Sequence, residues 1–355
     1  MAASFFSSNI DYMHKLLAVA TERRASDLHI LVGKPPILRI EGDLTEMAEY
    51  PVLTAKDAQD LVYSILDKTL QQKFFAEKET DFSYELPGIS RFRINVMWEK
   101  GNIGLVARVI NNIVPTMEGI MMPQIVYDLM RIKQGLILVT GPTGCGKSTS
   151  LAAMIDVINK ERKVHIITLE DPIEYVFTSD QSYIRQRQLG YDFLSFDQAL
   201  KHVVRQDPNV IMVGEMRDLE TIAAAITVAE TGHLVLATLH TLNAAQTVDR
   251  IIDVFPPHQQ DQIRLQLSME LRGVVSQQLV AGTKGHRVAA REILINTPAL
   301  ANLIRENKIA QIKTVLQTGA ETGMVSLEQD LRRLLKEGLI TEDTLKAYSA
   351  HQEGS

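Results

Sequence analysis

A glycine-rich segment near the middle of the chain has the residue types and spacing of a phosphate-binding loop. It reads GPTGCGKST over residues 141–149 and directly follows the apolar run at 136–140. This sequence fits the pattern G-x-x-x-x-G-K-[ST] in the strand–loop–helix context that the motif requires. Its glycines let the backbone curl so that several N–H groups point at one anion, and the following helix adds its positive end. The predicted nucleotide-binding residues are Gly141, Pro142, Thr143, Gly144, Cys145, Gly146, Lys147, Ser148 and Thr149.

Three side chains of this loop need separate interpretation. The Lys147 ammonium would bridge the β- and γ-phosphates, and the Ser148 hydroxyl would hold Mg²⁺. Cys145 is the single cysteine of the sequence. We interpret it as a small filler residue; a redox switch is the alternative, and it lacks the support of a second thiol.

Carboxylates follow two further apolar runs. The run at 164–169 leads into an acidic stretch, and the run at 210–214 leads into a glutamate. Because active sites of open α/β sheets lie at the carboxyl ends of parallel strands, we expect these carboxylates near the phosphate loop. The candidates are Glu170, Asp171, Glu174 and Glu215. Glu215 would orient the attacking water, as in a Walker B arrangement, and reach Mg²⁺ through a water, whereas the others would assist. A solvated acidic loop and a surface acid at a strand end are the alternatives.

Two histidines bracket the apolar run at 234–239. His240 follows the run together with Thr241 and Asn243, and His233 precedes it. We predict that both histidines sense the γ-phosphate of the nucleotide. The alternative is that each is a structural histidine at the edge of a strand.

The elements that must position these residues follow from the apolar pattern. The runs at 136–140, 164–169, 210–214 and 234–239 alternate with helical stretches, which predicts a parallel sheet covered on both faces. Before them lies a mixed α/β unit, with strands expected over 28–32, 37–44 (with a turn at 42–43), 92–98 and 104–110 and helical structure over 54–78. After Pro298 the chain reads as mainly helical. Asn111, Asn112 and Pro115 break the pattern, so the predicted domains are 1–112, 113–297 and 298–355.

The amino-acid composition argues against several classes of protein. The 355 residues include 37 Lys and Arg against 43 Asp and Glu, and the net charge of -6 argues against a nucleic-acid translocase. One cysteine excludes an intramolecular disulfide and a four-cysteine zinc module. We see neither a signal peptide nor an apolar run long enough to span a membrane, so we expect a soluble, cytoplasmic protein.

The order of the motifs resembles the secretion-ATPase superfamily. The phosphate loop, TLEDPIEY at 168–175, GEMRD at 214–218 and GHLVLATLHT at 232–241 match its Walker A, Asp, Walker B and His boxes. The type IV pilus retraction ATPase family (PilT and PilU) is the most similar branch, and the similarity covers nearly the whole chain. The resemblance implies an α/β fold: a PAS-like N-terminal domain, a RecA-like P-loop ATPase core and a C-terminal helical region.

The resemblance also implies an activity and partners. It implies a homohexameric motor that hydrolyses ATP with Mg²⁺ and drives pilus retraction, and so twitching motility, by acting on an inner-membrane platform protein. A paralogous retraction ATPase is a further partner, and the expected location is cytoplasmic, at the inner face of the membrane. N-domain arginines reach the phosphates in such rings, and Arg91, Arg93 and Arg108 match that pattern. Arg91 and Arg93 alternate on a strand, so a solvated face is the alternative.

Two positions depart from the family pattern. Ala301 stands where the family usually has an arginine, and Gln188 stands where it has a glutamate. The departure at Ala301 leaves open whether the chain is a main retraction motor or an accessory PilU-like paralogue. A nucleotide-switched regulator is a further alternative, against which the intact Glu215 argues. Extension and secretion ATPases normally have an additional N-terminal domain and often a Cys-rich zinc insertion, so the short N-terminal region and the single cysteine favour the retraction branch.

Overall fold

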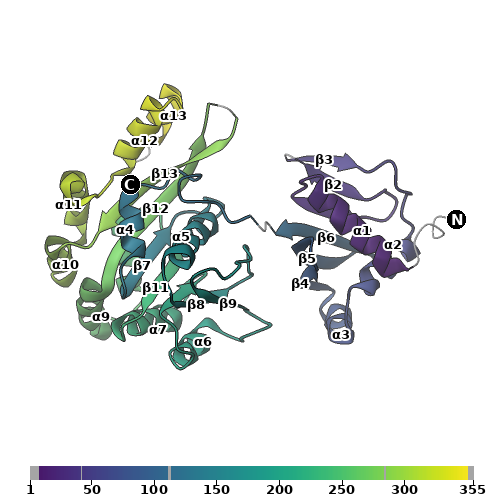
Figure 1. Ribbon diagram of the computed structural model, residues 1–355, viewed down its shortest axis with the longest axis horizontal. Coiled ribbons are helices and arrows are strands. Elements are labelled where there is room, and N and C mark those ends of the chain that lie inside the picture. The colour runs from purple at the N-terminus through teal and green to yellow at the C-terminus, as the bar shows by residue number, and fades with distance from the viewer. Residues whose placement is uncertain (1–7, 41, 111–112, 284, 351–355) are drawn as a thin grey trace. The chain divides into compact units, whose positions relative to one another are not determined.

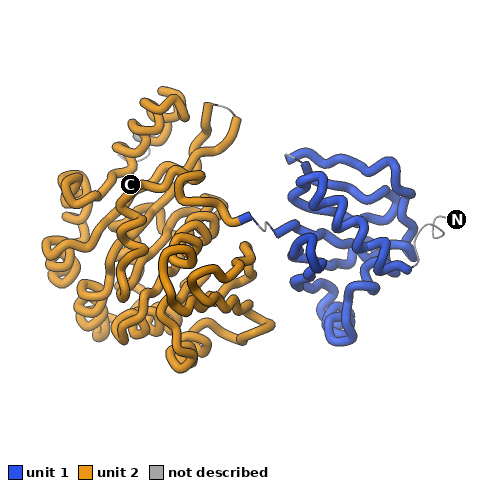
Figure 2. Tube along the Cα trace, in the orientation of Figure 1, with its two compact units in different colours: residues 1–113 blue, residues 114–355 orange. Residues whose placement is uncertain are grey.

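The computed structural model describes residues 8–40, 42–110, 113–283 and 285–350. The chain divides into two compact units, residues 1–113 and residues 114–355 (Figure 2). Asn111 and Asn112, where the sequence predicts the first domain break, lie outside the described residues, as do residues 351–355 of the predicted helical region. No helix within the described ranges is both long and apolar enough to cross a lipid bilayer.

Unit 1 is built on a six-stranded antiparallel sheet in the order β3-β2-β1-β6-β5-β4 (Figure 1). Its strands are β1 (Asp27–Ile30), β2 (Ile37–Ile40), β3 (Asp43–Glu46), β4 (Glu79–Leu86), β5 (Ser90–Glu99) and β6 (Asn102–Ile110). Its helices are α1 (Asn9–Glu22), α2 (Ala55–Ser64) and α3 (Lys68–Glu77). Alternate residues of β5, such as Phe92 and Ile94, are buried in the core that the sheet shares with α1 and α2. This unit has the α/β character that the sequence predicts.

The helical structure predicted over 54–78 is confirmed, and it consists of two helices separated by a short break. Thr54 begins α2 with a capping box, in which its backbone N–H and hydroxyl both bond Asp57. Asp67 begins α3 by accepting a hydrogen bond from the Leu70 N–H at 2.8 Å. Apolar residues continue through the break, and Ile65 is buried there, so the periodicity alone does not reveal it.

Unit 2 contains a seven-stranded sheet in the order β13-β12-β7-β11-β10-β8-β9 (Figure 1). Its strands are β7 (Gly135–Thr140), β8 (His165–Glu170), β9 (Tyr183–Gln188), β10 (Val210–Val213), β11 (Leu234–Leu239), β12 (Leu271–Ala281) and β13 (Arg287–Ile295). Neighbouring strands are parallel except β12 and β13, which are antiparallel. The predicted parallel sheet is therefore confirmed, although β9, β12 and β13 are not among the predicted strands.

Helices cover both faces of this sheet because its central strands are apolar on both sides. In β7, Leu136 and Leu138 belong to one core, whereas Ile137 and Val139 belong to the other. The second core includes α4 (Gln124–Met130) and α5 (Lys147–Glu161), and the first includes α6 (Phe196–Val203), α7 (Leu219–Glu230), α8 (Ala244–Asp253) and α9 (Pro257–Glu270). Each fully buried Leu or Ile side chain contributes roughly 1.5–3 kcal/mol of transfer free energy, so the strand that carries the phosphate loop is firmly held.

The last part of unit 2 is helical, which confirms the predicted C-terminal helical region. It contains α10 (Pro298–Arg305), α11 (Ile312–Thr318), α12 (Leu327–Lys336), α13 (Glu342–Ala350) and short 3₁₀ turns over Ile309–Gln311 and Gly319–Thr322. Helix α12 is anchored on β13, because the buried Asp330 carboxylate accepts hydrogen bonds from the Arg291 backbone N–H and from Arg333 Nε, both at 2.8 Å. Ala301 lies half-buried in α10.

Candidate nucleotide-binding site

The phosphate loop connects the buried strand β7 to the first residue of α5, Lys147. Gly141, Gly144 and Gly146 have φ angles of 141°, 76° and 87°, in a region that residues with a side chain rarely adopt. A Cβ at Gly141 would also lie 2.6 Å from the Cys145 sulfur and overlap a carbonyl oxygen of β12. The backbone course of the loop thus requires the glycines of the motif.

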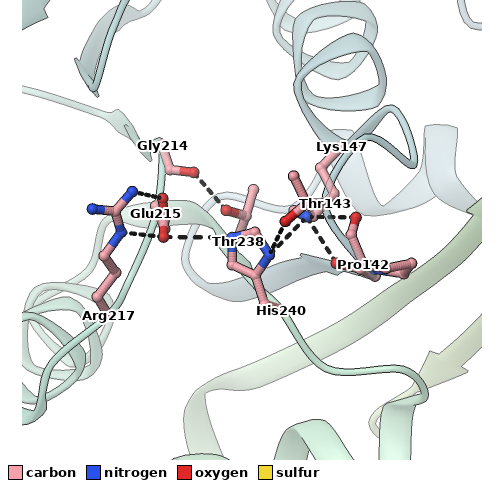
Figure 3. A network of polar contacts seen from close by, with 9 residues as sticks. Pro142, Thr143, Lys147, Gly214, Glu215, Arg217, Thr238 and His240 are labelled. Atoms are coloured by element: carbon pink, nitrogen blue, oxygen red, sulfur yellow. Dashed lines mark hydrogen bonds and ion pairs between the residues drawn. The ribbon is translucent and has the colours of Figure 1, made fainter.

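Lys147 directs its ammonium group across the loop. Its Nζ donates to the carbonyl oxygens of Gly141 at 2.7 Å and Pro142 at 3.1 Å (Figure 3). The residue is only 9% exposed, and this burial lowers the pKa of Lys147. A charge that is poorly hydrated attracts an anion more strongly than the same charge at an open surface. The position of Lys147 therefore suits a contact with phosphate.

His240 joins the phosphate loop to the end of β10 (Figure 3). Its Nδ1 lies 3.4 Å from Lys147 Nζ and 3.4 Å from the Thr143 hydroxyl, and its Nε2 lies 3.4 Å from Glu215 Oε1. The phosphate-loop segment after β7 thus supplies two side chains to a single cluster, and the ends of β10 and β11 supply one each. The structure brings together Lys147, Glu215 and His240, the three residues with the most specific predicted roles.

Glu215 is held by an arginine that the sequence analysis missed. Both oxygens of its carboxylate accept hydrogen bonds from Arg217, from Nε and, at 2.8 Å, from Nη2. These bonds lower the pKa of Glu215, so the carboxylate stays ionised and able to accept a hydrogen bond from water. The Thr238 hydroxyl fixes the same strand end by donating to the Gly214 carbonyl at 2.5 Å. The signal for Arg217 was its place two residues after Glu215, on the same side of an extended segment.

The acidic stretch after β8 is split between the protein interior and the surface. Glu170 is buried, and its Oε1 accepts hydrogen bonds from the Thr168 hydroxyl at 2.6 Å and from Gln186 Nε2 at 3.1 Å. Burial raises the pKa of Glu170 to about 7. Asp171 and Glu174 are exposed, and the Glu174 charge acts on Lys147 by opposing the lowering of its pKa. Of these carboxylates, Glu174 therefore acts on the charge of Lys147, whereas the buried Glu170 does not.

We expect Glu170→Gln to change how stability depends on pH. Between its unfolded and folded pKa values, 4.5 and about 7, Glu170 keeps a proton in the folded state that the unfolded chain releases. The folded state binds more protons in this window, so the free energy of unfolding falls as pH rises through it, by about 3 kcal/mol at most. The variant does not titrate, so its stability relative to wild type should rise over the window in unfolding experiments.

Glu220→Gln is the matched control for this experiment, because Glu220 is an exposed glutamate in the first turn of α7 and its charge does not act on Glu170. It should keep the pH dependence of the wild type. A difference between Glu170→Gln and wild type that stays constant from about pH 5 to about pH 8 would contradict the buried placement of Glu170.

Side chains of β9 and α5 hold the stretch that follows Glu170. Gln186 donates to the Tyr175 carbonyl at 2.7 Å, and Gln188 accepts a hydrogen bond from the Ile173 N–H at 3.4 Å. Tyr175, a second residue that sequence reasoning missed, shares a 3.0 Å hydrogen bond with the Thr149 hydroxyl of the phosphate loop. The departure at Gln188 thus has a structural account, since a neutral amide oxygen accepts this backbone bond without placing a charge in the buried site.

The structure does not bring His233 to this cluster. Its Nδ1 lies 3.1 Å from the Thr231 hydroxyl and 3.1 Å from the Val228 carbonyl, at the end of α7. Strand β11 begins directly after His233 and ends before His240, so the two histidines are roughly 20 Å apart at ~3.3 Å per residue. The contacts of His233 within unit 2 are those of a histidine that closes a helix, and the predicted contact with nucleotide has no support there.

The three arginines expected to reach the phosphates lie in unit 1. Arg93 on β5 and Arg108 on β6 are cross-strand partners, so they share one face of the sheet with Arg91. Arg108 Nε lies 2.9 Å from Asp27 Oδ1, and Arg93 Nε lies 3.8 Å from Asp81 Oδ1. Their predicted role at the nucleotide stays a prediction.

The donor set near the loop fits a magnesium ion. No cluster of three or more His, Cys, Asp or Glu side chains among the described residues could hold a metal by itself. Mg²⁺ does not need such a cage, because it usually keeps several waters and binds one or two protein oxygens together with the phosphates of its nucleotide. The half-buried Ser148 at the start of α5 and the ionised Glu215 offer such oxygens.

Comparisons with known proteins bear on the whole chain. The model of the family described as type II/IV secretion system protein matches residues 6–348. The chain is 46% identical to the type IV pilus retraction ATPase PilT of Pseudomonas aeruginosa, over 94% of this chain and 96% of that protein. It is 40% identical to the type IV pilus ATPase PilU of the same organism, over 94% of this chain and 88% of that protein.

A solved structure agrees with the sequence comparisons. The crystal structure of the pilus retraction motor PilT with bound ADP matches the fold with a TM-score of 0.88 and 44% identity, covering 94% of this chain and 95% of that chain. The similarity therefore includes the N-terminal unit as well as the unit with the phosphate loop. The chain belongs to the type II/IV secretion system protein family, and within it to the PilT/PilU-like ATPases.

Proposed function

We propose that this chain is a Mg²⁺-dependent ATPase that powers the retraction of type IV pili. The observation that carries the proposal is the position of His240, 3.4 Å from the Lys147 ammonium on one side and 3.4 Å from the Glu215 carboxylate on the other. A cation for the γ-phosphate and a carboxylate for the attacking water thus lie on either side of one imidazole. The relatives named PilT and PilU support the assignment to pili.

The proposed reaction is hydrolysis of ATP to ADP and phosphate. The loop N–H groups and Lys147 bind the β- and γ-phosphates. Glu215 accepts a hydrogen bond from a water, whose oxygen attacks the γ-phosphorus while the bond to the bridging oxygen of ADP breaks. Ser148, and Glu215 through a water, would hold Mg²⁺, which would neutralise part of the phosphate charge. His240 contacts both the Lys147 ammonium and the Glu215 carboxylate, and so it responds to the presence of the γ-phosphate.

Assembly and location are further parts of the proposal. We propose that the chain forms a homohexamer. Each chain would contribute three regions, 1–112, 113–297 and 298–355. When the domains close, Arg91, Arg93 and Arg108 would approach the phosphates. An arginine supplied in this way can accelerate phosphoryl transfer by roughly 10³–10⁵, which would couple hydrolysis to domain motion. The ring would act at the cytoplasmic face of the inner membrane on a platform protein, alone or with a paralogous ATPase.

Deletion of the gene separates the possible roles in pilus biology. We expect mutant cells to carry surplus surface pili and to lose twitching, because pilin subunits enter the fibre and no longer leave it. Bald cells would contradict the proposal and indicate an extension motor. Surplus pili with twitching that is only reduced would indicate an accessory, PilU-like role. The alanine at position 301, where the family usually has an arginine, leaves this role open.

A further inference from the structure

A buried glutamine lies directly behind the phosphate loop. Gln277 is on β12, the strand that pairs with the loop-bearing strand β7, and it is 1% exposed. Both ends of its side-chain amide are bonded to the loop region. Nε2 donates to the Cys145 carbonyl at 2.7 Å, and Oε1 accepts from the Ser150 hydroxyl in the first turn of α5 at 2.7 Å.

Two glycines of the loop pack against the same residue. A Cβ at Gly141 would overlap the Gln277 carbonyl oxygen, and a Cβ at Gly146 would lie 3.4 Å from Gln277 Nε2. Gln277 thus meets the loop at its first glycine, at its middle and at its junction with α5. Few side chains could replace it, because a neighbour at this distance must fill the space and satisfy a donor and an acceptor at once.

The bond to Cys145 fixes the direction of a peptide group. In a trans peptide the C=O and the following N–H point in opposite directions. Since Gln277 holds the Cys145 carbonyl toward β12, the Gly146 N–H must point the other way, into the loop. Inward N–H groups are what a phosphate-binding loop offers its anion.

Gln277 is itself firmly placed. On the neighbouring strand its direct partner is Arg291, which is 1% exposed. The Arg291 backbone N–H donates to the Asp330 carboxylate at 2.8 Å, and its guanidinium donates to the Met121 carbonyl at 3.2 Å. The strand pair behind the loop is therefore bonded both to α12 and to the segment that precedes α4.

We propose that Gln277 is a positioning residue for nucleotide binding, which holds the Cys145–Gly146 peptide so that its N–H faces the phosphates. This inference rests on the proposed ATPase activity. This positioning role of Gln277 differs from a general contribution to core stability, because it predicts a change in the affinity for nucleotide. Loss of the amide should weaken the binding of ATP and ADP more than it slows the chemical step, since Glu215 and His240 follow other strands, β10 and β11.

Gln277→Met tests this inference, because Met has a similar length and offers neither bond. We expect the KM for ATP and the Kd for Mg-ADP to rise at least ~10-fold, about 1.4 kcal/mol by the conversion at 25 °C, with kcat within about threefold of wild type. Gln278→Met is the matched control: it is the next residue of β12, half-buried and directed to the opposite face. It should leave both constants unchanged.

Ser150→Ala is the second variant. It removes only the hydroxyl that donates a hydrogen bond to Gln277 Oε1. It should raise the KM by a smaller factor, roughly threefold, since one of the two bonds that orient the amide is lost. Circular dichroism and thermal unfolding of the full-length variants show whether each one is folded at the assay temperature.

Three results would overturn the inference. One is a folded Gln277→Met with a lower melting temperature but wild-type KM and Kd, which indicates core stability alone. Another is equal changes in the Gln277→Met and Gln278→Met variants. The third is an unfolded Gln277→Met together with an unchanged KM in Ser150→Ala. A wild-type chain that does not turn over ATP would instead contradict the proposed function itself, so the two failures are distinguishable.

Discussion

Lys147→Ala is expected to abolish binding of ATP as well as its hydrolysis. The ammonium is the cation that the loop presents to the β- and γ-phosphates. Two charge-assisted hydrogen bonds of this kind contribute roughly 3–6 kcal/mol, so affinity should fall ~10²–10⁴-fold. The variant also leaves the Gly141 and Pro142 carbonyls without the donor that they have in the wild type. Titration with a fluorescent ATP analogue and steady-state turnover measure the two losses.

A second lysine of the same helix provides the control. Lys160 lies in the last turn of α5, exposed and paired with Asp156 at 2.6 Å. Lys160→Ala should bind and hydrolyse ATP as the wild type does, because Lys160 lies at the far end of α5 from the phosphate loop. Mg²⁺-dependent turnover that survives in Lys147→Ala would show that the phosphate loop is not where ATP is hydrolysed.

Glu215→Gln is expected to separate binding from hydrolysis. Glutamine has nearly the shape of glutamate and can still accept a hydrogen bond from Arg217, so the cluster should keep its geometry. It lacks the charge that polarises the attacking water, and loss of such a group lowers kcat by roughly 10²–10⁴-fold. Affinity for ATP should stay within about threefold, because the loop and Lys147 are intact.

The control for this variant is Glu220→Gln, an exposed glutamate in the first turn of α7. It should keep full turnover. Equal, low turnover in wild type and Glu215→Gln would favour the alternative of a nucleotide-switched regulator. In that case the carboxylate that β10 delivers to the cluster would have no part in hydrolysis.

Local sequence signals predicted that the side chains of the candidate site would lie together. The motif at 141–149 combines fixed residues with a fixed context, and Glu215 and His240 each follow a short apolar run. Such runs form buried parallel strands here, and the carboxyl ends of parallel strands meet at one edge of the sheet. Convergence of side chains that are far apart in sequence thus follows from strand direction alone.

The same reasoning distinguishes the positions of the two histidines. His233 and His240 flank one strand and look equivalent in the sequence. A strand has two ends, however, and only the carboxyl end faces the phosphate loop in this sheet. The geometry therefore favours His240 and places His233 beside α7.

Contacts between distant segments account for what the sequence did not reveal. Gln277 bonds Cys145 across 132 positions of sequence, and no local pattern marks it as part of the loop. Strand β9 is one of the two edge strands of the sheet and is polar, so its residues, which include Gln186 and Gln188, do not form an apolar run. Tertiary packing, rather than local propensity, decides these elements.

Retraction of individual pili in cells that carry Glu215→Gln in the chromosomal gene tests the central claim most directly. If hydrolysis at this site powers retraction, pili labelled with a fluorescent dye should extend but not shorten, although the variant protein is present and binds ATP. The corresponding Glu220→Gln cells should retract their pili at the wild-type rate. Normal shortening of pili in Glu215→Gln cells would contradict the account.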